Sequence, residues 1–123
     1  MSLFPGMMKG EEFVRLPNGE HAFIDLRKFY DYILDNEHDE GKHKARLFQS
    51  VLGITICNVD LLVKALREAA RSNEVILGKK DDYGQRFTID FYFIGPISKA
   101  VIRSAWIIRT GEEIPRFVSC YLR

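Results

Sequence analysis

The stretch RFTIDFYF, residues 86–93, decides the fold, because apolar and polar side chains alternate along it without interruption. The apolar members, which would share one side of an extended strand, are Phe87, Ile89, Phe91 and Phe93. The polar members, which would share the other side, are Arg86, Thr88, Asp90 and Tyr92. This alternation predicts a β-strand with one face on a core and the other face toward water.

Further extended segments surround this strand. Val75–Leu77 is a short apolar run, and the interval KKDDYGQ that follows it has the composition of a turn. Gly95-Pro96 ends the central strand, and residues 99–109 and 116–122 continue the two-residue period on either side of the turn TGEE. We therefore expect an antiparallel sheet of about four strands within residues 74–122.

Before residue 74 the apolar side chains recur with the period of a helix. Helices are expected over residues 26–35, 41–52 and 58–72. Residues able to cap their N-termini are Asp25, Asp39 and Asn58. The predicted fold class is α+β, with about three N-terminal helices on one face of a C-terminal antiparallel sheet. The helical side chains expected to pack against the apolar side of the central strand are Phe29, Ile33, Phe48 and Leu66.

The N-terminal region carries weaker patterns. Residues 1–10 contain no periodicity and include Pro5-Gly6, so we expect a flexible leader followed by a single domain over residues 11–123. In EFVRLPNGEHAFID, short apolar runs flank Pro17-Asn18-Gly19, which predicts a small hairpin or an extended pair.

Composition narrows the classes of function. The chain has 123 residues, of which 46% are hydrophobic, enough to form one core. Its formal net charge is +1, which excludes a polyanion-coating protein, but residues 1–40 carry a net −5 and the remainder +6. No apolar run approaches the roughly 18 residues of a membrane span, and the N-terminus lacks a secretory pattern. We expect a soluble, cytoplasmic protein with no membrane partner.

Cysteine and histidine usage gives no sign of a metal site. Cys57 and Cys120 stand in apolar surroundings without a CxxC spacing, so we expect both to be buried and free of a disulfide. His21, His38 and His43 are not spaced as ligands on one helix face. The glycine-rich phosphate-binding motifs of ATP and dinucleotide sites are absent from the sequence, so we expect no cofactor.

The water-facing side of the sheet is the first candidate site. The cationic and hydroxyl side chains expected there are Arg103, Arg109, Arg116, Ser119 and Tyr121. Such a surface could hold a phosphodiester and stabilise the charge that develops on phosphorus. The alternative is that these arginines form ordinary salt bridges; the acids available for that are Asp90, Glu112 and Glu113.

The run GKHKARLF, residues 41–48, is the second candidate. His43 has the side-chain type best suited to proton transfer near neutral pH. Lys44 precedes Phe48 by four residues, so its stem shares the inward face of the helix and its ammonium needs a partner. That partner is either a substrate phosphate or, in the structural alternative, an acid such as Asp90.

Several spaced pieces together resemble a bacterial domain family of unknown function. They are RKFYDYILDNEHDEGKHKARLF, YGQRF, AWII and IPRFVSCYL, and the match spans roughly residues 16–122. The family pattern has a Gly-x-x-Lys-Ala-x-x-Phe helix and a closing strand Pro-Arg-x-Val-Thr-x-Tyr-Pro. The order of elements also resembles, more distantly, the metal-independent nucleases of the barnase, EndoU, colicin and RelE type, whose site lies on the open face of the sheet.

The resemblance assigns family positions to named residues of this chain. They are Lys28, Gly41, Lys44, Ala45, Phe48, Tyr83, Gly84, Trp106, Pro115, Arg116, Ser119 and Tyr121. The chain departs from the pattern with Ser119 in place of threonine, Cys120 in place of alanine and Leu122 in place of the final proline. The terminal hydroxyl is kept, whereas the backbone around it differs. The nuclease resemblance implies RNA as a partner and a cognate inhibitor protein.

Two functions from different classes fit these residues. The first is RNA cleavage without a metal, with Lys44 and Arg116 on the phosphate and with His43, Ser119 or Tyr121 moving protons or positioning the substrate. The second is a non-catalytic binding or assembly module that uses a basic face for a protein or nucleic acid. A single cleft holding Lys44, Arg116, His43 and Ser119 would favour the enzyme. A scattered set, or a Lys44 locked in a buried ion pair, would favour the module.

Overall fold

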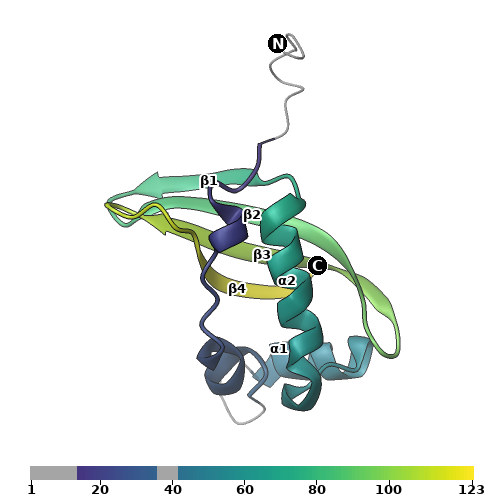
Figure 1. The fold of residues 1–123 in the computed structure, drawn as a ribbon. Helices are drawn as coiled ribbons and strands as arrows, with labels where there is room; N and C mark the ends of the chain where they lie inside the picture. The colour runs from purple at the N-terminus through teal and green to yellow at the C-terminus, as the bar shows by residue number, and fades with distance from the viewer. Residues whose placement is uncertain (1–13, 36–41) are drawn as a thin grey trace, which may run out of the picture.

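The computed structural model describes residues 14–35 and 42–123. Within these ranges helices precede strands and the sheet is antiparallel in the order β1-β2-β3-β4, which confirms the predicted α+β class (Figure 1). The strands are β1 (Ile76–Asp81), β2 (Gly84–Ile94), β3 (Lys99–Arg109) and β4 (Arg116–Leu122). The expected leader over residues 1–10 and the expected helix start at Asp39 and Gly41 lie outside the described residues.

The predicted bounds of β3 and β4 are confirmed, but β1 differs. It runs from Ile76 to Asp81, so the first three residues of the expected turn KKDDYGQ belong to β1, and its last two belong to β2. The register between β1 and β2 shifts between Leu77 and Lys80, and most of β1 is exposed. An exposed edge strand has no buried face to impose alternation, and its lysines are typical of such edges.

The helical segments lie where they were expected, but the first is shorter and the second changes helix type along its length. The first is a π-turn, η3 (Phe29–Ile33); α1 (Lys42–Leu47) continues into η4 (Phe48–Leu52), and η5 (Ile56–Asn58) precedes α2 (Val59–Ser72). Within the described ranges, no single helix is long and apolar enough to cross a membrane. The combination of α1–η4 with η5–α2 reaches that length and composition only as a pair bent by 62°.

The π-turn and the start of α2 have local causes. Phe29, Ile33 and Leu34 are all buried, and the Leu34 amide donates to the Phe29 carbonyl over 2.9 Å, which widens the turn. Asn58 is a cap residue as expected, although it acts on the turn before α2. Its Oδ1 accepts from the Thr55 amide at 2.8 Å, while the Thr55 hydroxyl accepts from the Cys57 amide.

The core lies between the helices and the apolar face of the sheet. All eight side chains predicted to face each other across it are buried in one cluster: Phe29, Ile33, Phe48, Leu66, Phe87, Ile89, Phe91 and Phe93. Trp106 of β3 is fully buried among them, and its Nε1 donates to the Ser104 hydroxyl at 2.9 Å. That hydroxyl donates in turn to the Ile89 carbonyl at 2.8 Å, so the polar atoms inside the core are paired.

The predicted hairpin around Pro17-Asn18-Gly19 is wrong. Arg15 forms an antiparallel bridge with Glu74, whereas Phe23 forms a parallel bridge with Arg116, so the two arms pair with different partners. Asn18 adopts the left-handed conformation (φ 55°) and leads into η2 (Gly19–His21) instead of a returning strand. A Cβ on Gly19 would lie 1.9 Å from the Ala70 carbonyl oxygen, so only glycine lets this arm cross α2.

Phe91→Ala tests the core. Phe91 is buried, so its truncation should lower the free energy of unfolding by about 3–5 kcal/mol in chemical denaturation. The matched control is Tyr92→Ala on the opposite face, where the side chain is 75% exposed and the change should stay within about 0.5 kcal/mol. Equal effects of the two substitutions would contradict the observed register of β2.

Candidate functional site

The face of the sheet that the helices leave uncovered carries three rows of side chains. In Figure 1, α2 lies across one face of the sheet. The side chains that alternate with the buried ones along β2 and β3 point to the other face. Across β2, β3 and β4 the rows are Arg86–Ile107–Arg116, Thr88–Ala105–Ser119 and Asp90–Arg103–Tyr121. Successive rows are two residues apart, or about 7 Å along the strands. We call this surface the open face; its position confirms the predicted division into a core side and a wet side.

A β-bulge brings the residues of β4 onto the open face. Trp106 pairs with Phe117 and Ala105 pairs with Ser119, so Val118 is an extra residue in β4. In a regular strand, Arg116 and Ser119 are three residues apart and would lie on opposite faces. The bulge removes that conflict, and Arg116, Ser119 and Tyr121 all lie on the open side.

Lys44 reaches this face from α1. Its Nζ donates to the Ser119 hydroxyl at 3.2 Å and lies 5.9 Å from the centroid of the Tyr121 ring. The side chain is half-buried, as the helical spacing predicts. A cation over an aromatic ring and beside a hydroxyl is held in one place, so Lys44, Ser119 and Tyr121 form a defined cluster, which we call the lysine cluster.

Asp90 anchors the row next to the lysine cluster. It accepts two bonds from Arg103, each of 2.8 Å, and one from Arg123 at 2.7 Å. The hydrogen bond from Arg103 is the main reason that the pKa of Asp90 is lowered. The same bond raises the pKa of Arg103, and a hydrogen bond to Tyr121 adds to this effect. Both oxygens of Asp90 are thus engaged by arginines, and the described hydrogen bond of Lys44 is to Ser119.

Arg116 and His43 lie apart from the lysine cluster. Arg116 forms a two-pronged pair with Glu112, with both distances 3.0 Å, and its guanidinium carbon lies 5.6 Å from the centre of the Phe23 ring. This pair lowers the pKa of Glu112. His43 precedes Lys44 on α1, is exposed, and has no hydrogen-bond partner among residues 14–35 and 42–123. The structure therefore joins Lys44, Ser119 and Tyr121, with Arg116 on the same face but in another row. The single cleft of Lys44, Arg116, His43 and Ser119 that would favour the enzyme is not formed, and the separation of Arg116 and His43 favours the binding module.

Two residues that contact the site, Arg123 and Phe23, were not among the predicted site residues. Arg123 follows Ser119 and Tyr121 at the same two-residue spacing, which was the available signal for its place beside Asp90. Phe23, by contrast, lies beside Arg116 because the two residues form a β-bridge, although they are far apart in the chain. No local sequence pattern predicts this contact.

The histidine and cysteine side chains can be compared with the predictions for metal binding and for thiol burial. In the described part of the chain, no group of three or more His, Cys, Asp or Glu side chains is placed to hold a metal ion. Cys120 is buried as expected, and burial raises the pKa of its thiol to about 12. The expected burial of Cys57 is wrong, because the η5 turn that Thr55 caps places this thiol in solvent.

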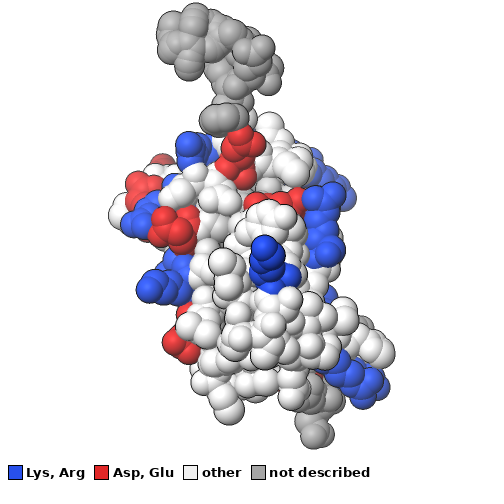
Figure 2. Space-filling model, turned by 90° about the vertical axis from the view of Figure 1, so that its right-hand side faces the viewer, with Lys and Arg blue, Asp and Glu red and all other residues white. Residues whose placement is uncertain are grey.

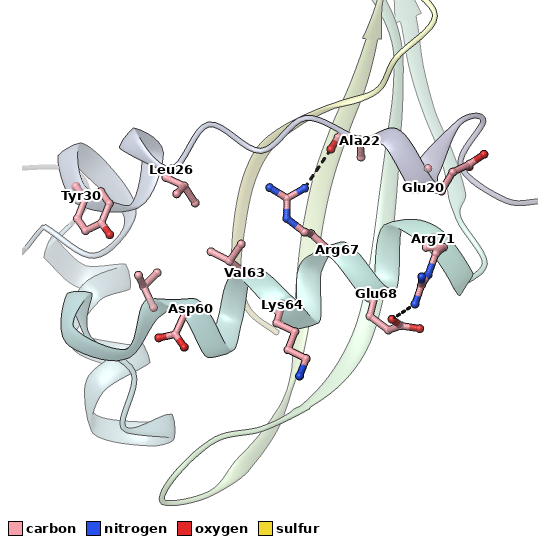
Figure 3. Close-up of a pocket in the computed structure, with 12 residues that line it drawn as sticks. Glu20, Ala22, Leu26, Tyr30, Asp60, Val63, Lys64, Arg67, Glu68 and Arg71 are labelled. Carbon is pink, nitrogen blue, oxygen red and sulfur yellow. Dashed lines mark hydrogen bonds and ion pairs between the residues drawn. The ribbon is translucent and has the colours of Figure 1, made fainter.

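A groove of about 510 Å³ lies on the helical side, between α2 and the segment that begins at Gly19. Figure 3 shows Leu26 and Val63 facing each other across it and Arg67 directed at the Ala22 carbonyl, which it reaches at 3.4 Å. Glu68 and Arg71 form an ion pair at one end. None of the predicted site residues lines this groove.

The end of the β2–β3 hairpin is largely uncharged. Figure 2, which looks at that side, shows a broad area of uncharged side chains that surrounds one basic group, with further charged groups toward its edges. Ile94 and Ile97 are exposed there, and the Ile97 amide donates to the Leu52 carbonyl at 3.4 Å. None of the predicted site residues lies in the loop between β2 and β3, residues 95–98.

Comparison with known proteins gives a family and a fold. The family model described as Domain of unknown function (DUF6883) matches residues 15–123. A chain of a "Contact-dependent growth inhibition toxin - immunity protein complex from Klebsiella pneumoniae 342" is similar in structure, with a TM-score of 0.67 and 20% identity. The similarity covers 83% of this chain and 100% of that chain, and at this identity it shows the fold alone. No curated protein matches significantly.

Asp90→Asn tests the arginine pairing through its pH dependence. Because the pKa of Asp90 is lowered in the folded state, the pairing stabilises the protein above the ordinary value of 3.8 and is lost as pH falls through the lowered value. The variant should unfold with about 1 kcal/mol less free energy at pH 7. In urea denaturation this deficit should shrink toward pH 3, whereas exposed Asp60→Asn should show no comparable effect. A deficit of equal size at both pH values would contradict the pairing.

Thiol titration tests the positions of the two cysteines. A disulfide reagent at pH 8 should react at once with one thiol per native chain, that of exposed Cys57, and with two after unfolding. Cys57→Ser should remove the native reaction. Rapid reaction of two thiols in the native protein would place Cys120 at the surface.

Proposed function

We propose that this chain, which belongs to the DUF6883 family of domains of unknown function, is a metal-independent ribonuclease whose reaction takes place at the lysine cluster. The observation that carries the proposal is the 3.2 Å contact between Lys44 Nζ and Ser119 Oγ beside the Tyr121 ring. Three groups able to hold a phosphate or move a proton meet there from distant parts of the chain. The fold shared with a chain of a contact-dependent growth inhibition toxin–immunity protein complex is in keeping with a toxin.

The reaction we propose is transfer of the phosphodiester within the RNA strand. The 2′-oxygen attacks phosphorus and loses its proton, the bond from phosphorus to the 5′-oxygen breaks, and that oxygen gains a proton. The products are a 2′,3′-cyclic phosphate and a 5′-hydroxyl, with no oxidant or second substrate. Lys44 and Arg103 stabilise the added charge on the phosphoryl oxygens, and the Ser119 hydroxyl positions Lys44.

Tyr121 is the proton-handling group that the contacts favour. It lies opposite Arg103 in the register of β3 and β4, and its ring lies beside Lys44, so both cations that would hold a phosphate neighbour its phenol. His43 has the more suitable side-chain chemistry near neutral pH, but it is exposed one residue before Lys44. It stays a predicted site residue, and the same experiment tests it.

RNA and an inhibitor are the partners that this function requires. The RNA strand would lie on the open face, where Arg103 and Arg116 are two rows apart. A cognate inhibitor protein would act by covering that face, in keeping with the toxin–immunity complex that shares the fold. The alternative is a non-catalytic module with a basic face, which the separation of Arg116 and His43 from the lysine cluster favours. It predicts binding of the same RNA without a product.

The test is incubation of the purified protein with total RNA in excess chelator. The wild-type chain should cleave and leave cyclic phosphate ends, and Lys44→Gln should slow cleavage by about 10²–10³-fold. Tyr121→Phe, which removes only the hydroxyl, should slow it by about 10²-fold or more. The matched control is Lys64→Gln, an exposed lysine of α2 on the helical side, which should cleave like the wild type.

Three results would overturn this function. They are loss of cleavage in chelator, full activity of Lys44→Gln, and salt-sensitive binding without any product, which identifies the module instead. If His43→Gln slows cleavage strongly and Tyr121→Phe does not, the protein is still a ribonuclease, but His43 and not Tyr121 is the residue that moves the proton. Melting curves that match the wild type are required of every variant compared.

A further inference from the structure

A basic cleft of about 570 Å³ lies at the other end of the open face from Asp90. Its cationic lining residues are Lys28, Lys79, Arg86, Arg109 and Arg116. The one carboxylate in the lining, Asp25, is already held by Arg27 through bonds of 2.8 and 3.1 Å. Among the lining side chains the cations are therefore in large excess, and the floor between Arg86 and Arg116 is the apolar Ile107.

Arg86 is incompletely paired in this cleft. Its Nη1 is buried without a hydrogen-bond partner among the described residues, and its Nη2 lies 3.7 Å from Asp81, beyond hydrogen-bond distance. A buried donor without an acceptor is costly and calls for an explanation. Because Nη1 makes no bond, turning the half-exposed guanidinium toward a ligand in the cleft gives up only the long contact with Asp81.

Arg116 supplies a second, different surface on the same row. Glu112 holds its guanidinium by two bonds, and the ring of Phe23 lies 5.6 Å away, so the planar group is fixed in orientation. Bases of single-stranded nucleic acid stack on arginine planes and on aromatic rings. Arg86 thus offers charge for a phosphate and Arg116 offers a plane for a base, separated by one strand.

We propose that this cleft binds the nucleotide next to the scissile phosphate, with its phosphate on Arg86 and its base on the Arg116–Phe23 surface. The inference rests on the proposed ribonuclease, because the cleft and the lysine cluster belong to one face. The Arg86–Arg116 row is one row from Ser119 and two from Tyr121, or about 7 and 13 Å along the strands. One strand of RNA lying on the open face would contact both places.

The experiment measures binding separately from cleavage. A fluorescent single-stranded oligonucleotide of eight 2′-O-methyl nucleotides cannot be cleaved by attack of a 2′-hydroxyl, and its anisotropy reports the dissociation constant. Arg86→Gln should weaken binding about tenfold and reduce the salt dependence by about one phosphate contact. Lys64→Gln, which removes the same charge on the helical side, should change the dissociation constant by less than twofold. Arg116→Ala should also weaken binding, by about tenfold.

Inorganic phosphate distinguishes a strand site from a site for a free anion. Under the proposal, phosphate alone binds at least about tenfold more weakly than the oligonucleotide, because it lacks the stacked base. Equal affinity for the two probes, or equal weakening by Arg86→Gln and Lys64→Gln, overturns it. Arg86→Lys keeps the charge, so it tests the cleft if Arg86→Gln does not fold. If the wild-type chain does not cleave RNA but Arg86→Gln still weakens oligonucleotide binding, the proposed ribonuclease activity is refuted and the proposed binding site is not.

Discussion

The burial of Trp106 decides which side of the sheet becomes the core, and the other features follow from it. Its indole nitrogen is satisfied by the Ser104 hydroxyl, which itself donates to the Ile89 carbonyl, so the ring can be buried completely. A slip of one residue in β3 would expose Trp106 and turn Arg103 into the core, where an unpaired charge is very costly. The register that protects the tryptophan therefore also places Arg103 beside Asp90 and Tyr121.

The parts of the fold that could be predicted are those that follow from patterns among residues close together in the sequence. The strand around Phe91 could be recognised because alternation is a local property, and the facing helical residues, such as Phe48, followed from a local period too. The path of the N-terminal arm depends instead on Phe23 meeting Arg116 and on Gly19 lying against Ala70. Those contacts join residues that are distant in sequence, so a turn signal alone suggested a hairpin that does not form.

In the candidate site, too, local patterns could be predicted from the sequence and contacts between distant residues could not. Alternation predicted that Ser119 and Tyr121 share a face, and helical spacing predicted that Lys44 turns inward. The contact between Lys44 and Ser119 could not be predicted, because it needs the placement of α1 against the edge strand. Nor could the position of Arg116 relative to Ser119, because it depends on the extra residue Val118 in β4. A bulge leaves little trace in a single sequence, since any residue can occupy it.

The contact between Lys44 and Ser119 spans 75 residues of chain, which has a consequence for biosynthesis. Lys44 emerges from the ribosome early, but its partner strand β4 is translated after the rest of the sheet. Until Tyr121 has left the exit tunnel, one edge of β3 is unpaired and Lys44 lacks the β4 residues that it contacts. The lysine cluster therefore forms only after β4 has been translated, and a ribosome that stops before β4 releases a chain without it.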